Sequence, residues 1–121
     1  MIFHRTARQI LGQEGEKIAL DFLRKKEYKI VEKNFRKGNF GEINLIAYDH
    51  NQLVFIEVKT KSTHQFGLPE EEFNFHKKRK LFRTINDYFW QKKIKNDNRR
   101  IDLVAIDFSE IKPKIYHYQA V

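Results

Sequence analysis

Cysteine is absent from the 121 residues of this sequence. Its absence excludes disulfides, thiolate nucleophiles and cysteine-ligated zinc, because all three need a cysteine sulfur. The chain also lacks any apolar run approaching the ~20 residues of a membrane-spanning helix. Residues 1–8 lack the continuous apolar stretch of a secretory signal. We therefore expect a cytoplasmic protein that does not cross a membrane.

Acidic residues are outnumbered by basic ones. The chain has 24 Lys and Arg against 16 Asp and Glu, which gives a formal net charge of +8. An excess of this size predicts an anionic partner, either nucleic acid or an anionic membrane surface. The histidines fall at no metal-ligand spacing, and we expect them mostly at the surface. They are His4, His50, His64, His76 and His117.

Length and patterning predict one α+β domain. With 40% hydrophobic residues, 121 residues suffice for a single core over 1–121, with residues 1–9 expected to be flexible. Apolar residues recurring at helical spacing predict helices at about 11–26 and 75–94. Strands are predicted at 28–36, 41–47, 53–60, 100–108 and 114–118. The order α-β-β-β-α-β-β, with three strands in an antiparallel meander, predicts a sandwich-like fold with helices packed on a mixed sheet.

Within the third strand, a carboxylate and an ammonium stand side by side. Strand side chains alternate, so Glu57 and Lys59 project from one face. In phosphodiester hydrolysis a carboxylate can hold Mg²⁺ against the phosphate while a lysine orients the attacking water. A salt bridge on a solvated strand is the alternative, and so short a pattern favours it. The apolar run around the pair shifts the balance, because charges in a buried strand need a partner or a metal.

Glu16 lies on the apolar side of the first predicted helix. It is in line with Ala19, Leu20 and Leu23 through the i+3, i+4 and i+7 relations, so it faces the sheet. An inward carboxylate can be a further acidic group of a metal site. Equally, it can form a structural pair with a Lys or Arg at the core edge.

Basic residues concentrate between residues 77 and 100. This segment has ten Lys or Arg against Asp87 and Asp97, an excess equal to the net charge of the whole chain. A solvated lysine-rich helix face is one interpretation, and a phosphate-binding surface is the other. The latter explains why cations crowd a helix start, where the dipole disfavours them. The nearby aromatic residues Tyr88, Phe89 and Trp90 are more typical of a core than of a base-stacking platform, with Phe82 and Trp90 at the core margin.

Two further features bear on the site. The connection after Lys59 begins where the Glu57 strand ends, so its residues, Lys61 among them, are candidates to meet a substrate phosphate. Asp102 lies in a largely buried strand, and we expect an arginine or lysine such as Arg100 to hold it.

The stretch Gly-Glu-Ile-Asn-Leu-Ile-Ala (41–47), followed by a hairpin and Val-Phe-Ile-Glu-Val-Lys-Thr (54–60), resembles the YraN family of uncharacterised bacterial proteins. That family resembles PD-(D/E)xK nucleases and archaeal Holliday-junction resolvases. The resemblance runs from about residue 15 to about residue 108 and takes in Gly15-Glu16, Phe66-Gly67 and Asp102-Leu103-Val104-Ala105-Ile106. It departs from the family at Asn44, where the family has an aspartate.

The resemblance implies a restriction-endonuclease-like core and a set of site residues. Glu57, Glu16 and the residue at position 44 would hold Mg²⁺ or Mn²⁺, and Lys59 would serve the water. Glu42, two residues before Asn44, is a further candidate ligand. Because an amide adds no charge, Asn44 should weaken metal binding. The expected nucleic-acid-binding residues are Lys61, Lys77, Lys78, Lys80 and Arg83.

Three hypotheses follow for the function. The first is a nucleic-acid-binding relative of metal-dependent endonucleases, acting on DNA, and on branched DNA in particular. The second is a catalytically inactive DNA- or RNA-binding module, and the third is a protein-interaction domain with incidental charge. A homodimer would suit a junction-shaped substrate, which is an argument from the fold alone.

Overall fold

The computed structural model describes residues 6–36, 38, 41–62, 75–95 and 97–121. Two helices and five strands follow one another in the predicted order, so the α+β fold class is confirmed. The elements are α1 (Ala7–Lys25), β1 (Lys29–Arg36), β2 (Glu42–Asp49), β3 (Gln52–Lys61), α2 (Phe75–Lys92), β4 (Arg99–Asp107) and β5 (Lys114–Tyr118). Of the residues named in the sequence analysis, His4, His64 and Phe66-Gly67 lie outside the described residues.

The strands form one mixed sheet in the order β1-β2-β3-β4-β5. Antiparallel pairing of β1 with β2 and of β2 with β3 confirms the predicted meander. β4 then pairs with β3 in parallel, from Leu53 opposite Arg99 to Lys61 opposite Asp107, and β5 closes the sheet antiparallel to β4. The parallel pairing requires a crossover connection, which contains α2. The central strand β3 therefore lies between two neighbours of opposite direction.

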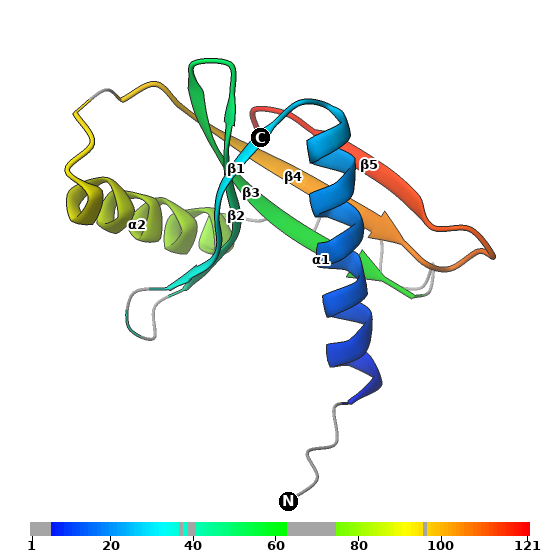
Figure 1. Ribbon diagram of the computed structural model, residues 1–121. Helices are drawn as coiled ribbons and strands as arrows, with labels where there is room; N and C mark the ends of the chain where they lie inside the picture. The colour runs from blue at the N-terminus through cyan, green and yellow to red at the C-terminus, as the bar shows by residue number, and fades with distance from the viewer. Residues whose placement is uncertain (1–5, 37, 39–40, 63–74, 96) are drawn as a thin grey trace, which may run out of the picture.

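The two helices pack on opposite faces of the sheet, so the central strand β3 is buried on both sides. Leu53 and Phe55 join the core under α2, whereas Val54 and Ile56 join the core under α1. On the α2 side the apolar stripe of the helix is buried, namely Leu81, Ile85, Tyr88 and Phe89. Figure 1 shows α1 (blue) crossing the sheet and α2 (yellow-green) lying beside β2, in agreement with the contacts of α1 with β3 and of α2 with β2.

Helix α1 starts earlier than its apolar pattern predicted. Instead of about residue 11, it begins at Ala7, with Thr6 as the N-cap. The Thr6 hydroxyl accepts a hydrogen bond from the Gln9 N–H at 3.1 Å, and the Gln9 side chain accepts one from the Thr6 N–H at 2.9 Å. This reciprocal capping box satisfies two backbone donors that a helix start otherwise leaves unpaired. The Thr-x-x-Gln pattern was the signal that gave the true start.

Strand β1 is irregular. The pairing with β2 shifts between Ile30 and Glu32, so Val31 turns outward and is 47% exposed. Val31 therefore does not join Tyr28 in the core. A one-residue shift of this kind reverses the faces of the residues that follow it.

No described helix is long and apolar enough to span a membrane.

Candidate functional site

Glu57 and Lys59 form a close ion pair on β3, on the α2 side of the sheet. The Lys59 Nζ atom lies 3.6 Å from Glu57 Oε1, and the two side chains are 24% and 20% exposed. Strand alternation sets them on one face, as the sequence predicted. Burial raises the pKa of the Glu57 carboxyl, while the charges of Lys59 and Lys77 lower it and the charge of Glu42 raises it further. Burial outweighs the lysines, so the pKa of Glu57 stays above its usual value.

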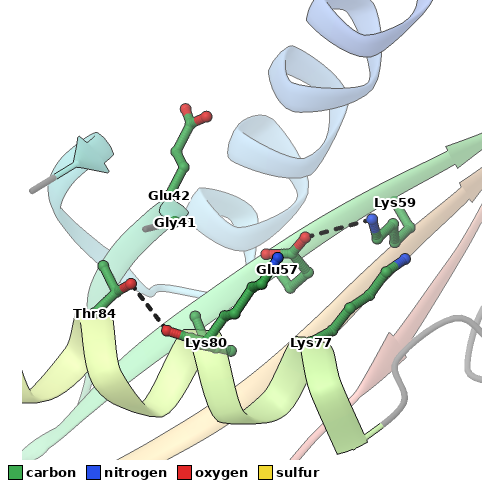
Figure 2. Close-up of a pocket in the computed structure, with 8 residues that line it drawn as sticks. Gly41, Glu42, Glu57, Lys59, Lys77, Lys80 and Thr84 are labelled. Atoms are coloured by element: carbon green, nitrogen blue, oxygen red, sulfur yellow. Dashed lines mark hydrogen bonds and ion pairs between the residues drawn. The ribbon is translucent and has the colours of Figure 1, made fainter. Parts of the chain in front are cut away.

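The Glu57–Lys59 pair opens into a cavity between β3 and the first turns of α2. Its lining residues are Gly41, Glu42, Glu57, Lys59, Lys77, Lys80, Leu81 and Thr84. Figure 2 shows the Lys77 and Lys80 side chains extending from α2 toward Glu57 and Lys59. We call this the E-x-K cavity. It gathers three lysines around the partly buried carboxylate of Glu57, with Glu42 as the second acidic residue of its lining.

Gly41 lets α2 approach this closely. A Cβ atom at Gly41 would lie 2.9 Å from Thr84 Oγ1, closer than real side chains approach. The Thr84 hydroxyl itself donates to the Lys80 carbonyl at 3.0 Å. The glycine that precedes β2 therefore leaves room for the turn of α2 that carries Lys80 and Thr84.

Glu42 lines the E-x-K cavity but is bound elsewhere. Its Oε2 accepts a hydrogen bond from Arg36 Nη2 at 2.9 Å, and in Figure 2 its carboxylate points away from Glu57. It remains close enough for its charge to raise the pKa of both Glu16 and Glu57. Glu42 thus acts on both glutamates through its charge while Arg36 holds its carboxylate.

Asn44 and Glu16 meet in a second cavity. Asn44 Nδ2 donates to Glu16 Oε1 at 3.4 Å, and Asn44 Oδ1 accepts from the Val58 N–H at 2.8 Å. This cavity is lined by Gln13, Glu16, Lys17, Leu20, Lys33, Asn34, Asn44 and Leu45. Burial raises the pKa of Glu16, followed by the charge of Glu42, while hydrogen bonds from Asn34 and Asn44 lower it. The predicted inward glutamate thus has an amide as its partner, not a lysine or arginine.

The five candidate site residues consequently divide between two cavities. Glu57, Lys59 and Glu42 line one, Glu16 and Asn44 line the other, and the peptide N–H of Val58 links Asn44 to β3. Within the described ranges, no three histidine or acidic side chains gather where they could hold a metal ion. Mg²⁺ needs several oxygen ligands in a near-octahedral arrangement. Because Glu57 and the Glu16–Asn44 pair line different cavities, the donor set as arranged here does not converge on one divalent cation.

The predicted nucleic-acid-binding residues do not all lie in one place. Lys77 and Lys80 line the E-x-K cavity, Arg83 is exposed on α2 and Lys78 is half-buried. Lys61, by contrast, is buried with 8% exposure and stands opposite Asp107 at the end of the β3–β4 ladder. A buried lysine in that place does not belong to the exposed cationic surface.

The fully buried Asp102 is held as predicted. Arg100 makes two hydrogen bonds to its carboxylate, at 2.8 and 2.9 Å. His117 Nε2 lies 2.8 Å from Asp102 Oδ2, and the His117 side chain is only 3% exposed. His50 and His76 are at the surface as expected, but His117 is not. The alternation of β5, which puts Ile115 and His117 on one face, was the signal that pointed inward.

Trp90 is another residue that sequence reasoning misplaced. It is 79% exposed, and Phe82 is 47% exposed. At 100° per residue, Trp90 lies almost opposite the centre of the buried stripe Leu81, Ile85 and Tyr88. Its apolar side chain led to the prediction that it lies at the margin of the core. Its angular position on the helix already indicated the solvent-facing side.

The fold and these two cavities define a small α+β protein with a charged E-x-K strand beneath a basic helix. It belongs to the uncharacterised protein family UPF0102, whose sequence pattern matches residues 15–106. This confirms the resemblance to the YraN family, another name for the same group.

Relatives named UPF0102 proteins match most of the chain. The protein of Thermodesulfovibrio yellowstonii is 46% identical over 106 residues, covering 88% of this chain and 93% of that protein. The protein of Caldanaerobacter subterraneus subsp. tengcongensis is 44% identical over 102 residues, covering 84% and 83%. The protein of Carboxydothermus hydrogenoformans is 38% identical over 114 residues, covering 94% and 96%.

Proposed function

We propose that this protein binds nucleic acid, with the phosphate backbone held in the E-x-K cavity. The observation that carries the proposal is the charge of that cavity, in which Lys59, Lys77 and Lys80 face Glu57 and the Arg36-bound Glu42. Lysine ammonium groups attract phosphate oxygens and release counterions when they bind. A cavity with more cationic than anionic side chains favours a phosphodiester over a divalent cation.

The location of these lysines on α2 supports an anionic ligand. The helix has no acidic residue in its first turn, while Lys77 and Lys80 stand near its start. A helix start attracts anions and disfavours cations, by about 0.3–1 kcal/mol for each cation at the surface. A bound phosphate would relieve both the repulsion among the lysines and their conflict with the helix dipole. Resemblance to the PD-(D/E)xK nucleases favours DNA as the source of that phosphate.

A metal-dependent endonuclease is the second candidate function. The Glu57–Lys59 ion pair favours it, because this pair is the E-x-K element of the nucleases that the sequence resembles. However, Asn44 and Glu16 line another cavity and bond to each other, so the donor set for Mg²⁺ or Mn²⁺ is incomplete around Glu57. We therefore rank binding without cleavage first.

The test is the salt dependence of binding to fluorescently labelled DNA, measured by anisotropy. Each lost phosphate contact should reduce the slope of log affinity against log salt by ~0.9. We expect Lys77→Ala/Lys80→Ala to weaken binding and to reduce this slope by about 1.8, the value for two lost phosphate contacts. The control Lys25→Ala/Lys112→Ala removes the same charge from exposed residues outside the cavity and should leave the slope unchanged.

Equal slopes for wild type and for the Lys77/Lys80 variant would exclude the E-x-K cavity as the phosphate site. The same samples, incubated with Mg²⁺ or Mn²⁺ and analysed for cleavage of branched DNA, test the second candidate. Cleavage that disappears in Lys59→Ala would establish the endonuclease instead.

A further inference from the structure

An exposed stripe of aromatic and cationic residues runs along the outer face of α2. Arg79, Phe82, Arg83, Asn86 and Trp90 all lie within ~100° of arc at 100° per residue, and the stripe is ~16 Å long. Trp90 is 79% exposed and Phe82 is 47% exposed, while the opposite side of the helix packs on the sheet. Large exposed aromatic residues in such an arrangement are typical of a contact surface.

This stripe is continuous with the E-x-K cavity. A neighbouring hollow on α2 is lined by His76, Arg79, Lys80 and Arg83, so Lys80 belongs to both hollows. Arg79 and Arg83 then lead to Phe82 and Trp90 along the same face. At the far end of the helix, Asn86 Oδ1 accepts a hydrogen bond from Arg99 at 2.8 Å, which places another guanidinium beside the stripe. A ligand in the cavity can therefore extend along α2.

Charge decides which ligand suits the stripe. Helix α2 carries six Lys or Arg and one acidic residue, Asp87. Two copies of this face would bring like charges together, which disfavours self-association through it. An anionic partner with flat aromatic groups matches both the guanidinium groups and the exposed rings.

We propose that Trp90 and Phe82 form a stacking platform for the bases of single-stranded nucleic acid, while Arg79 and Arg83 contact its phosphates. The proposal rests on the proposed function, because the strand would continue from the phosphate site in the E-x-K cavity. Bases in a duplex are already paired and stacked, so their faces are not available to the two rings. Unpaired bases can stack on aromatic side chains whatever their sequence. The stripe thus favours single strands over duplex.

The chain offers a direct probe, since Trp90 is its single tryptophan. A base stacked on the indole should quench its fluorescence. We expect a 20-nucleotide oligo(dT) to quench Trp90 at the concentrations that give binding by anisotropy, and a duplex of equal length to quench it less. An oligo(U) of the same length distinguishes RNA from DNA, and quenching by either strand supports the platform.

Substitution gives the second criterion. Trp90→Leu keeps an apolar side chain but removes the ring, and should weaken binding about 5- to 150-fold, as expected for one lost stacking contact. Trp90→Phe should retain most of the affinity, and Ile111→Ala, at a fully exposed apolar residue between β4 and β5, should retain all of it.

The outcomes separate this inference from the proposed function. If the oligonucleotide binds with steep salt dependence while Trp90 remains unquenched, or while Trp90→Leu binds as wild type does, the stacking platform is excluded and phosphate binding stands. If no nucleic acid binds even at low salt, both proposals fail.

Discussion

The amide of Asn44 connects Glu16 on α1 to the backbone of β3. Its Nδ2 donates to Glu16 Oε1 at 3.4 Å, and its Oδ1 accepts from the Val58 N–H at 2.8 Å. The neutral Asn44 side chain therefore forms hydrogen bonds with both the Glu16 carboxylate and the Val58 N–H. An aspartate could accept from Val58 but has no hydrogen to donate to Glu16.

Asn44→Asp should therefore destabilise the protein at neutral pH. The variant loses the bond to Glu16 and sets two carboxylates close together, which should cost about 1–3 kcal/mol in free energy of unfolding. Urea denaturation at pH 7 with a chelator measures this loss. Added Mn²⁺ should restore part of the stability, because a cation can replace the missing hydrogen.

Asn44→Ala is the matched control. It loses the bond to the Val58 N–H as well as the bond to Glu16 but adds no negative charge, so Mn²⁺ should not stabilise it. An Asn44→Asp variant as stable as wild type in the presence of chelator would contradict the role of the amide as donor.

Two glycines of α1 should respond in opposite ways to substitution by alanine. A Cβ at Gly15 would lie 2.0 Å from Thr60 Cγ2, whereas a Cβ at Gly12 would meet nothing within 4 Å. Gly15→Ala should lower the free energy of unfolding by about 1–3 kcal/mol through overpacking. Gly12→Ala should raise it by about 0.5–1 kcal/mol, because alanine is the better helix former. Thermal unfolding of the two variants, side by side, makes the comparison. Equal melting temperatures would mean that α1 does not approach β3 at Gly15.

Asp102 should contribute to stability above pH 4. Burial raises its pKa, but the hydrogen bonds from His117, Arg100 and the Ala120 N–H outweigh burial and hold the pKa at about 2. The unfolded chain has the ordinary value of 3.8, so the folded state binds this proton less tightly. The stabilisation, roughly 2 kcal/mol, is present above pH 3.8 and is lost as the pH falls through about 2.

Asp102→Asn removes this contribution and leaves the largely buried Arg100 without its closest carboxylate. We expect a loss of about 3 kcal/mol or more at pH 7, and a smaller further loss between pH 4 and pH 2 than in wild type. Urea midpoints across this pH range measure both. Parallel pH profiles for the two proteins would show that Asp102 titrates as it does in the unfolded chain.

Glu57 should have the opposite effect on the pH profile. Because its folded-state pKa is raised above 4.5, the folded protein binds the proton more tightly than the unfolded chain does. Stability from this group is therefore present below pH 4.5 and decreases as the pH rises through the raised pKa. Glu57→Gln should abolish that decrease, stabilise the protein at pH 7 and tighten binding of nucleic acid. Reduced stability at pH 7 would mean that the attraction of Lys59 outweighs burial.

The sequence predicted features that depend on local periodicity. Alternation along β3 placed Glu57 and Lys59 together, and helical spacing turned Glu16 toward the sheet. Apolar patterns also identified both helices and all five strands, with errors at their ends. These properties follow from neighbouring residues alone, so a single chain suffices to predict them.

The site as a whole depends on features that no local pattern contains. Glu42 and Asn44 are two residues apart on β2, which predicts one face, yet they line different cavities. Nearby, Asn34 of β1 has a φ of 53°, in the left-handed region, and the β1–β2 register shifts after Ile30. Irregularities of this kind redirect side chains at the sheet edge, and the strand alternation of the sequence does not reveal them.

The parallel pairing of β3 with β4 also bears on how the chain folds. The β1–β2–β3 meander brings together residues close in sequence, whereas Leu53 must find Arg99, which lies more than forty residues further along the chain. Contacts between such distant residues carry a larger entropy of loop closure and slow the search for the native topology. We therefore expect the E-x-K strand to gain its second neighbour only after the meander has formed.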